Sequence, residues 1–414
     1  MPEIILKNVT KRFGKFTAVE NLNLIIPDRS FITLLGPSGC GKTTTLRMIA
    51  GLEDPTSGKI TIDGKVVFDS EKGINISPAK RDVGFLFQNY ALWPHMTVYK
   101  NIAFGLKNLK WKKEDIDKRV NELLALLKIE KLGNRYPSEL SGGQQQRVAI
   151  ARTLAPQPKI LFMDEPLSNL DAKLRLEMRT ELKRLFKSTD STFVYVTHDQ
   201  LEAMTLSTKL CLMKEGVVEQ YDTALFTYAH PNNTFVADFV GSPTINFVEG
   251  TMKHNGGKHI LSFSGKEFEF VKNPKVKTPI DTASHLLEVE LKEYLKTKEQ
   301  EEPEKQEEMV DTTIEEQAPK VTLEEASKVV VGIRPEYLRI GSKGIEGVIY
   351  SSLPSGMSTT VLINLNDTIL TSVAFGIIDY QQDDTVKFEI VGDGIIIFDA
   401  ETKQNLGEGT LKEI

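Results

Sequence analysis

Cysteine is scarce in this chain, with only Cys40 and Cys211 among 414 residues. Cys40 lies inside a glycine-rich stretch, and a disulfide bond to it would obstruct that stretch. The simplest interpretation is a protein whose thiols stay reduced, as in the cytosol.

Long apolar runs and an excess of basic residues are also lacking. No apolar run approaches the roughly 20 residues that span a bilayer. The N-terminus has no basic segment leading into a long apolar one, so no secretory signal is expected. A net charge of -6 argues against a general nucleic-acid binder, and no nucleic-acid partner is expected. Any role at a membrane must therefore come through partner proteins.

The length of 414 residues exceeds what one compact domain usually holds, so two or three domains are expected. Up to about residue 235, short apolar runs alternate with amphipathic stretches, which is typical of a parallel α/β sheet. The expected strands are Ser30–Leu35, Lys159–Met163 and Thr192–Val196, the expected helices are Thr43–Ala50, Asp115–Leu127 and Leu174–Phe186, and Asp63-Gly64 predicts a hairpin over Ile60–Phe68.

From about Phe247 onward, short strand-like segments separated by turn residues predict a small β-barrel or sandwich. These segments are Ile260–Phe263, Phe268–Val271, Lys328–Ile333, Gly347–Tyr350, Thr359–Ile363, Thr385–Ile390 and Gly394–Phe398. An acidic segment that is poor in aromatic residues, at about 292–326, interrupts them. It cannot bury enough apolar surface to offset chain entropy, so we expect a disordered or helical surface insertion.

A glycine-rich stretch follows the first expected strand, and Gly36, Gly41, Lys42 and Thr43 fit the pattern G-x-x-x-x-G-K-[ST]. Glycines let backbone N–H groups wrap close to phosphate oxygens, and the following helix N-terminus adds positive charge. Lys42 would bridge the β- and γ-phosphates of ATP, and Thr43 would hold Mg²⁺. The predicted nucleotide-binding residues of this phosphate loop are Gly36, Pro37, Ser38, Gly39, Cys40, Gly41, Lys42, Thr43 and Thr44.

Two carboxylates, Asp164 and Glu165, end the strand Lys159–Met163. Ligands of open α/β sheets bind at the carboxyl ends of strands. Asp164 is therefore placed to hold Mg²⁺, and Glu165 to act as the general base on the attacking water. His198 follows the strand Thr192–Val196 in a parallel position. It could contact the γ-phosphate or the water, although a histidine after a strand is also often structural.

The stretch Leu140–Arg147, with sequence LSGGQQQR, resembles the signature motif of ABC ATPases. Its predicted nucleotide contacts are Ser141, Gly142, Gly143 and Gln144, at the start of a helix where they form a second anion-binding nest. An ordinary Ser-Gly-Gly turn that caps the helix would use the same residues. A generic P-loop enzyme, however, has no reason to carry the whole motif.

Further segments resemble motifs of the ABC family in the family's order. Gln88 resembles the Q-loop glutamine, which in the family senses Mg²⁺ and the attacking water and links to the transmembrane partner. Ser168–Asp171 resembles the D-loop, which contacts the facing subunit, and the resemblance places Asp171 at the nucleotide. His198 matches the switch histidine.

Phe13 matches the aromatic residue that stacks on adenine, with Phe16 or plain core packing as alternatives. The resemblance covers residues 3 to about 240 densely. It implies an α/β P-loop NTPase domain over residues 1–240, with a RecA-like core and a helical subdomain at about 89–155. A mostly β, OB-like regulatory domain is expected over residues 241–414.

Two stretches are similar to the importer branch that contains the maltose-type sugar transporter ATPases, namely Gln88–Val98 and Val331–Glu336. The acidic insertion is unusual for that branch. In addition, Tyr221–Ala224 stands where the branch commonly has Gly-Thr-Pro.

The resemblance implies a motor subunit that works as a pair. In the family, each ATP lies between the phosphate loop of one subunit and the signature of the other. This chain has one copy of each motif, so we expect a second ATPase subunit, in the form of a homodimer. Integral membrane permease subunits would be direct partners, and an extracellular or periplasmic solute-binding protein an indirect one. The chain would be peripheral, at the cytoplasmic face of the cell membrane.

The transported solute is expected to be a carbohydrate, with polyamine, iron or another anion as alternatives. Two other functions stay open. One is a non-transport ABC ATPase of DNA repair or translation, although the long coiled coils and the paired cassettes of those proteins are lacking. The other is a regulatory protein that binds nucleotide and sequesters a transcription factor through its β domain.

Overall fold

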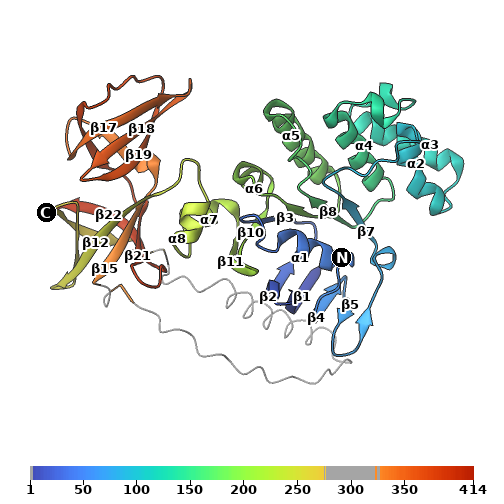
Figure 1. Ribbon diagram of the computed structural model, residues 1–414, viewed down its shortest axis with the longest axis horizontal. Coiled ribbons are helices and arrows are strands. Elements are labelled where there is room, and N and C mark those ends of the chain that lie inside the picture. Colours follow the sequence, from blue (N-terminus) through green and yellow to red (C-terminus); the bar gives the residue numbers. More distant parts are fainter. Residues whose placement is uncertain (1–2, 275, 277–321, 324–326) are drawn as a thin grey trace. The chain divides into compact units, whose positions relative to one another are not determined.

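The computed structural model describes residues 3–274, 276, 322–323 and 327–414. Two compact units can be distinguished, an N-terminal unit that ends at Ala224 and a C-terminal unit that begins at Leu225 (Figure 1). The predicted domain limits, 1–240 and 241–414, stay a prediction. The acidic insertion expected at about 292–326 lies outside the described residues, except for residues 322–323.

The N-terminal unit contains two sheets (Figure 1). The six-stranded sheet has the order β11 (Val217–Asp222), β10 (Lys209–Lys214), β3 (Phe31–Leu35), β9 (Thr192–Val196), β8 (Ile160–Asp164) and β7 (Val83–Leu86). Its strands are parallel except for β11 at one edge. The antiparallel sheet has the order β2 (Phe16–Ile26), β1 (Ile4–Phe13), β4 (Ser57–Ile62), β5 (Lys65–Asp69) and β6 (Ile74–Asn75). The predicted parallel α/β sheet is confirmed.

The described part of this unit contains six α-helices between residues 42 and 206. They are α1 (Lys42–Ala50), α2 (Val98–Asn108), α3 (Lys113–Leu126), α4 (Gly142–Leu154), α5 (Ala172–Ser188) and α6 (Gln200–Leu206). The spacing that predicted a helix at Asp115–Leu127 has its structural counterpart in α3, where Ile116, Val120, Leu123 and Leu124 are all buried. One face of this helix therefore packs against the hydrophobic core.

Strand β8 shows how the parallel sheet is buried on both faces. All five of its residues are buried. Leu161 and Met163 belong to one hydrophobic core, whereas Ile160 and Phe162 belong to another that contains residues of the antiparallel sheet. Successive side chains of a strand point to opposite faces, so a continuous apolar run fills both cores at once.

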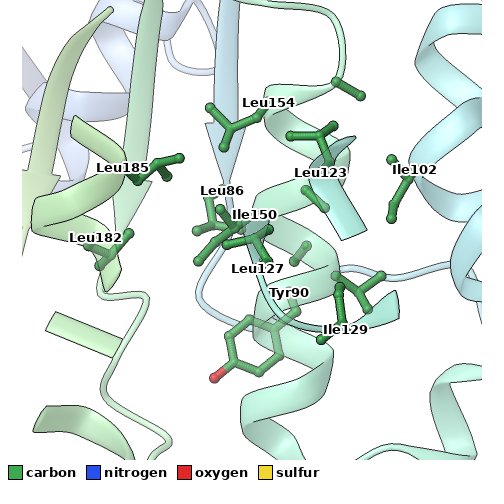
Figure 2. Packing of buried hydrophobic residues seen from close by; sticks show 14 of the residues in the cluster. Leu86, Tyr90, Ile102, Leu123, Leu127, Ile129, Ile150, Leu154, Leu182 and Leu185 are labelled. Carbon is green, nitrogen blue, oxygen red and sulfur yellow. The ribbon is translucent and has the colours of Figure 1, made fainter. Parts of the chain in front are cut away.

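Figure 2 shows the first of these two cores from close by. It collects residues from β7, from the segment after it, and from four helices: Leu86, Tyr90, Ile102, Leu123, Ile150, Leu182 and Leu185. Helices α2 to α4 thus share one apolar core with strands β8 and β9 of the parallel sheet.

The C-terminal unit is built almost wholly from antiparallel strands (Figure 1). A closed barrel has the order β12 (Asn246–Asn255), β13 (Lys258–Phe263), β14 (Lys266–Lys272), β22 (Asn405–Glu413), β21 (Ile395–Asp399) and β15 (Lys328–Ile333). A five-stranded sheet has the order β16 (Leu338–Gly341), β20 (Thr385–Ile390), β17 (Ile345–Pro354), β18 (Ser358–Leu365) and β19 (Thr368–Phe375). The predicted β-rich region is confirmed, and strands β12, β16, β19 and β22 are additional to those expected from the sequence.

Two short helices, α7 (Ala224–Ala229) and α8 (Thr234–Phe239), precede the barrel and are tied to it by Arg334. The Arg334 side chain is buried, and its Nη1 donates to the carbonyl oxygens of Ala237 at 2.9 Å and Val240 at 2.6 Å. Its Nη2 donates to the Tyr228 carbonyl at 2.7 Å, and the guanidinium lies 4.0 Å from the Tyr228 ring centroid. A cation thus caps the carbonyl ends of both helices, where the helix dipole favours positive charge.

No helix among the described residues combines the length and the apolar character needed to cross a bilayer.

Candidate nucleotide site

The order of the central strands brings the expected site residues to one edge of the six-stranded sheet. Strand β9 lies between β3 and β8, and all three run parallel. Their carboxyl ends are Leu35, Val196 and Asp164. The loop after β3, the acidic pair that ends β8 and the histidine after β9 therefore lie at the edge where open α/β sheets bind ligands.

The phosphate loop has a backbone that only glycine allows at two of its positions. A Cβ on Gly36, which has φ of +151°, would lie 2.2 Å from the Met213 carbonyl oxygen. A Cβ on Gly41, with φ of +99°, would lie 2.5 Å from the Ala18 carbonyl oxygen on β2. Gly41 is also the N-cap of α1, whose first N–H groups have no partner within the helix. This arrangement fits an anion such as a phosphate group.

Lys42 places its charge within the loop. Its side chain is 5% exposed, and Nζ donates to the carbonyl oxygens of Gly36 at 2.7 Å and Pro37 at 2.8 Å. Cys40 Sγ lies 3.6 Å from the same nitrogen. Burial raises the pKa of the Cys40 thiol, with Lys42 opposing the rise, so the sulfur stays a neutral thiol near pH 7. The loop therefore holds a cation without an anionic neighbour in Cys40.

Thr43 and Asp164 meet across the gap between α1 and β8. Thr43 Oγ1 donates to Asp164 Oδ1 at 2.8 Å, and Arg47 Nη2 lies 3.6 Å from Asp164 Oδ2. Burial raises the pKa of the Asp164 carboxyl, while the Thr43 hydrogen bond and Arg47 oppose the rise. A hydroxyl and a carboxylate oxygen side by side next to a phosphate loop are the protein ligands that Mg²⁺ takes in P-loop NTPases. The residues present fit that ion.

Glu165 and His198 form the second contact of the site. His198 Nδ1 lies 3.2 Å from Glu165 Oε1. Glu165 has φ of +44°, and its N–H donates to the Val196 carbonyl at the end of β9 at 3.0 Å. A residue other than glycine in the left-handed region costs free energy and persists where surrounding contacts enforce it. Here the strained backbone turns the carboxylate toward His198.

Gln88 and the predicted D-loop lie against each other. Gln88 Nε2 donates to Ser168 Oγ at 3.4 Å, and Asn169 Nδ2 donates to the Gln88 carbonyl at 3.3 Å. Ser168 Oγ in turn donates to the Glu165 carbonyl at 2.9 Å. The side chain of Asp171 accepts from Leu174 N at 2.9 Å and caps α5. The structure therefore connects Gln88 to Glu165 through Ser168 and gives Asp171 a capping role.

The predicted signature residues begin α4, with Ser141 as the N-cap. Ser141 N donates to Gln144 Oε1 at 3.0 Å, one arm of a capping box. A cavity of about 510 Å³ lies beside them and is lined by Ser141, Gly143, Gln144, Arg147, Lys128 and Lys131 among others. No residue of the phosphate loop is among the residues that line it.

Phe13 lies at the end of β1, on the hairpin that β1 forms with β2, and is 48% exposed. Lys11 Nζ lies 4.6 Å from the centroid of its ring. Phe16, the alternative, is 61% exposed. Plain core packing therefore does not account for either ring.

Two residues of this region were missed by sequence reasoning. Arg47 follows Thr43 by one helical turn, so the i, i+4 spacing of α1 could have indicated that both face Asp164. Arg175 lies in the basic helix α5 and contacts both the D-loop and Asp199. Nothing in the sequence separates it from the neighbouring basic residues.

The chain matches a family model described as ABC transporter over residues 19–168. It is 53% identical, over 65% of this chain and 73% of the relative, to the trehalose/maltose import ATP-binding protein MalK of Thermococcus litoralis. It is also 53% identical, over 60% of this chain and 66% of the relative, to the spermidine/putrescine import ATP-binding protein PotA of Chromobacterium violaceum. Among solved structures, cbiO1 from Clostridium perfringens, part of the ABC transporter complex cbiONQ, matches with a TM-score of 0.50. That match has 30% identity and covers 55% of this chain and 90% of cbiO1.

Proposed function

This chain belongs to the ABC transporter ATP-binding proteins of the importer branch and is a transport ATPase, and we propose that it energises the uptake of a carbohydrate. The proposal for the ATPase site rests on one pair of contacts above all. Thr43 meets Asp164 and His198 meets Glu165, at neighbouring strand ends. These contacts support separate roles for the two adjacent carboxylates, with Asp164 as a ligand of Mg²⁺ and Glu165 as the general base.

In this proposal, Lys42 and the N-terminus of α1 bind the β- and γ-phosphates, and Phe13 stacks on adenine. Glu165 accepts a proton from the attacking water. His198, 3.2 Å from Glu165 Oε1, orients that carboxylate and reaches the water or the γ-phosphate. Because the two ends of Glu165 are held by Val196 and His198, little reorganisation is needed when water arrives.

Thr43 and Asp164 would hold Mg²⁺, with Gln88 as the further candidate ligand. The ion would supply charge neutralisation on the phosphate oxygens. Gln88 reaches Ser168 at 3.4 Å, so its side-chain amide would turn from that partner to approach the ion or the water.

We place Ser141, Gly142, Gly143 and Gln144 at the ATP of a second, identical subunit. The cavity beside the signature supports this, since it is lined by residues between 128 and 147 and by Leu174 of α5, and by no residue of the phosphate loop. The start of α4 presents N–H groups to such a ligand. Each subunit would then complete the site of the other, and ATP would hold the pair together.

The pairing is tested by Glu165→Gln, which keeps ATP bound while removing the base. We expect a dimer in size-exclusion chromatography with ATP and Mg²⁺, and a monomer with ADP. Ser141→Arg in the same background should bind ATP through Lys42 yet stay monomeric. A dimer that survives Ser141→Arg contradicts the placement of the signature at the facing nucleotide.

As partners we propose two integral membrane permease subunits, contacted through the segment after Gln88, and indirectly an extracellular or periplasmic solute-binding protein. The chain would then sit on the cytoplasmic face of the membrane. Tyr90 and Ala91 in that segment have φ of +60° and +45°, an irregular backbone that fits a contact loop better than a continuing helix or strand. Copurification with integral membrane subunits tests this, and recovery of the chain without them opposes it.

Carbohydrate is proposed as cargo because the similarity to the trehalose/maltose protein extends over 273 residues. A polyamine is the second candidate, supported by equal identity to the spermidine/putrescine protein over 248 residues. The ATPase does not touch cargo, so the test uses the assembled transporter in proteoliposomes. Stimulation of ATP hydrolysis by maltose or trehalose supports the first candidate, and stimulation by spermidine replaces it with the second.

A further inference from the structure

Arg175, in the first turn of α5, joins two loops that flank the general base. Its Nη2 donates to the Leu170 carbonyl of the D-loop at 3.1 Å. Its Nη1 donates to Asp199 Oδ2 at 3.3 Å, on the residue directly after His198. A planar guanidinium can hold two such acceptors in fixed directions at the same time.

The contacts of Arg175 close a ring that begins and ends at Glu165. Ser168 Oγ, in the D-loop, donates to the Glu165 carbonyl at 2.9 Å. Arg175 links the D-loop, at Leu170, to Asp199. His198, next to Asp199, returns to Glu165 Oε1 at 3.2 Å. A shift of the D-loop is thereby connected with the histidine that contacts the base.

The part of this ring next to His198 is fixed by further hydrogen bonds. Asp199 Oδ1 accepts from Glu202 N at 3.0 Å and caps α6 while its other oxygen faces Arg175. Glu202 is 3% exposed, accepts from Tyr195 Oη at 2.8 Å and Thr197 Oγ1 at 2.7 Å, and has Arg175 Nε at 3.8 Å. The residues on both sides of His198 are thus fixed to buried groups, and Arg175 is the cation that faces them.

We propose that Arg175 is a positioning residue for hydrolysis, which couples the place of the D-loop to the orientation of His198 and hence of Glu165. The inference rests on the proposed pairing, because the D-loop would be set by the facing subunit. Arg175 does not touch the nucleotide. It acts through the two loops that it holds together.

Arg175→Lys separates this role from simple stabilisation. Lysine keeps the positive charge beside Asp199 and Glu202, but it cannot reproduce the two-directional fork that also holds the Leu170 carbonyl. We expect a thermal transition and a Kd for ATP close to those of the wild type, because the positive charge is kept and Arg175 lies away from the nucleotide. The turnover of the full-length chain should fall about 10- to 100-fold, as for other displacements of catalytic groups.

Arg184→Lys is the matched control, since Arg184 lies on the same helix and its side chain is 69% exposed beside Glu181. It should change neither turnover nor stability. Asp199→Asn is a second route to the same link, because asparagine still caps α6 while the charge-assisted bond to Arg175 is lost. It should lower turnover in the same direction as Arg175→Lys.

Wild-type turnover in Arg175→Lys, or in Asp199→Asn, overturns the proposal. The Glu165→Gln background distinguishes this outcome from a failure of the pairing. A dimer of Glu165→Gln and of Glu165→Gln/Arg175→Lys with ATP is expected. If Glu165→Gln stays monomeric with ATP, the proposed pairing is wrong. If Glu165→Gln forms a dimer but Arg175→Lys keeps wild-type turnover, only the role of Arg175 is wrong.

Discussion

The two units of this chain differ in where their important polar residues lie. In the N-terminal unit they follow the ends of buried parallel strands, in loops whose backbone is irregular, as at Gly36 and Glu165. In the C-terminal unit they lie inside, where Arg334 is 2% exposed and Glu408 is 4% exposed. One unit gathers polar groups at the ends of strands, where they can act on a ligand, and the other uses polar groups inside the unit to hold helices against a barrel.

The difference shows what a short motif can mean. Lys42 of the phosphate loop donates to carbonyl oxygens only five and six residues away, so local backbone geometry fixes the spacing of that contact. Arg334 belongs to a motif as well, but its acceptors Tyr228, Ala237 and Val240 lie 94 to 106 residues away. The contacts of Arg334 therefore depend on the tertiary fold and not on the sequence around it. The predictions below test whether the two units respond separately to changes of these two kinds.

Arg334→Met should have the largest effect on stability, and only on the C-terminal unit. It removes three charge-assisted hydrogen bonds and leaves buried carbonyl oxygens of α7 and α8 without a donor. We expect a loss of about 4 kcal/mol in the unfolding free energy of that unit. Calorimetry should show its transition moving to lower temperature.

The two tryptophans, Trp93 and Trp111, lie in the N-terminal unit and make fluorescence a selective control. In Arg334→Met the fluorescence transition and the turnover of ATP should stay as in the wild type. A fluorescence transition that moves together with the calorimetric one would mean that the two units unfold as one, and the comparison would not hold.

Gly36→Ala is the converse change, in the N-terminal unit. The new Cβ would meet the Met213 carbonyl oxygen at 2.2 Å, a backbone atom that cannot give way cheaply. We expect a loss of about 3 kcal/mol in the fluorescence-detected stability, together with loss of ATP binding.

Gly14→Ala is its control, because Gly14 also has positive φ but its Cβ would meet nothing within 4 Å. It should cost only about 1 kcal/mol, from backbone strain alone. Equal losses in the two variants would show that conformation, and not the contact with Met213, makes glycine necessary at position 36.

Sequence reasoning went furthest where chemistry and local geometry coincide. The α/β fold with a β-rich C-terminal region was predicted, as were an ATPase of the importer branch and the strand-end placement of Asp164 and Glu165. The contacts of Arg175 and Arg334 could not be predicted. Each depends on carbonyl groups or carboxylates that only the fold brings near. The sequence around a basic residue in a helix or after a strand does not indicate which acceptor that residue will contact.

ATP binding should stabilise one unit and leave the other unchanged. A ligand at 100 times its Kd that binds only the folded state raises the unfolding free energy by about 2.7 kcal/mol. This rise should be seen in the fluorescence of Trp93 and Trp111, and the calorimetric transition of the C-terminal unit should not move. Lys42→Ala should abolish the rise. A shift of both transitions with ATP would indicate that nucleotide binding is coupled to the β unit.

Glu408 gives the smallest predicted effect and a test by pH. Burial raises the pKa of its carboxyl above the ordinary value of 4.5, while hydrogen bonds with His230 and Asn405 oppose the rise. The folded state therefore holds the proton more tightly than the unfolded state does. The resulting stability is fully present below about pH 4.5 and is lost as the pH rises through the raised value.

Glu408→Gln removes this titration but keeps a side chain of the same shape. The unfolding free energy of the wild-type C-terminal unit, minus that of Glu408→Gln, should therefore fall as the pH rises above 4.5, by about 1.4 kcal/mol for each factor of ten by which folding tightens proton binding. Calorimetry from pH 4 to 8 measures this difference, and the exposed Glu346→Gln should show no such slope. A difference that instead grows with pH would mean that the hydrogen bonds with His230 and Asn405 outweigh burial. The buried carboxylate would then stabilise the barrel as an anion.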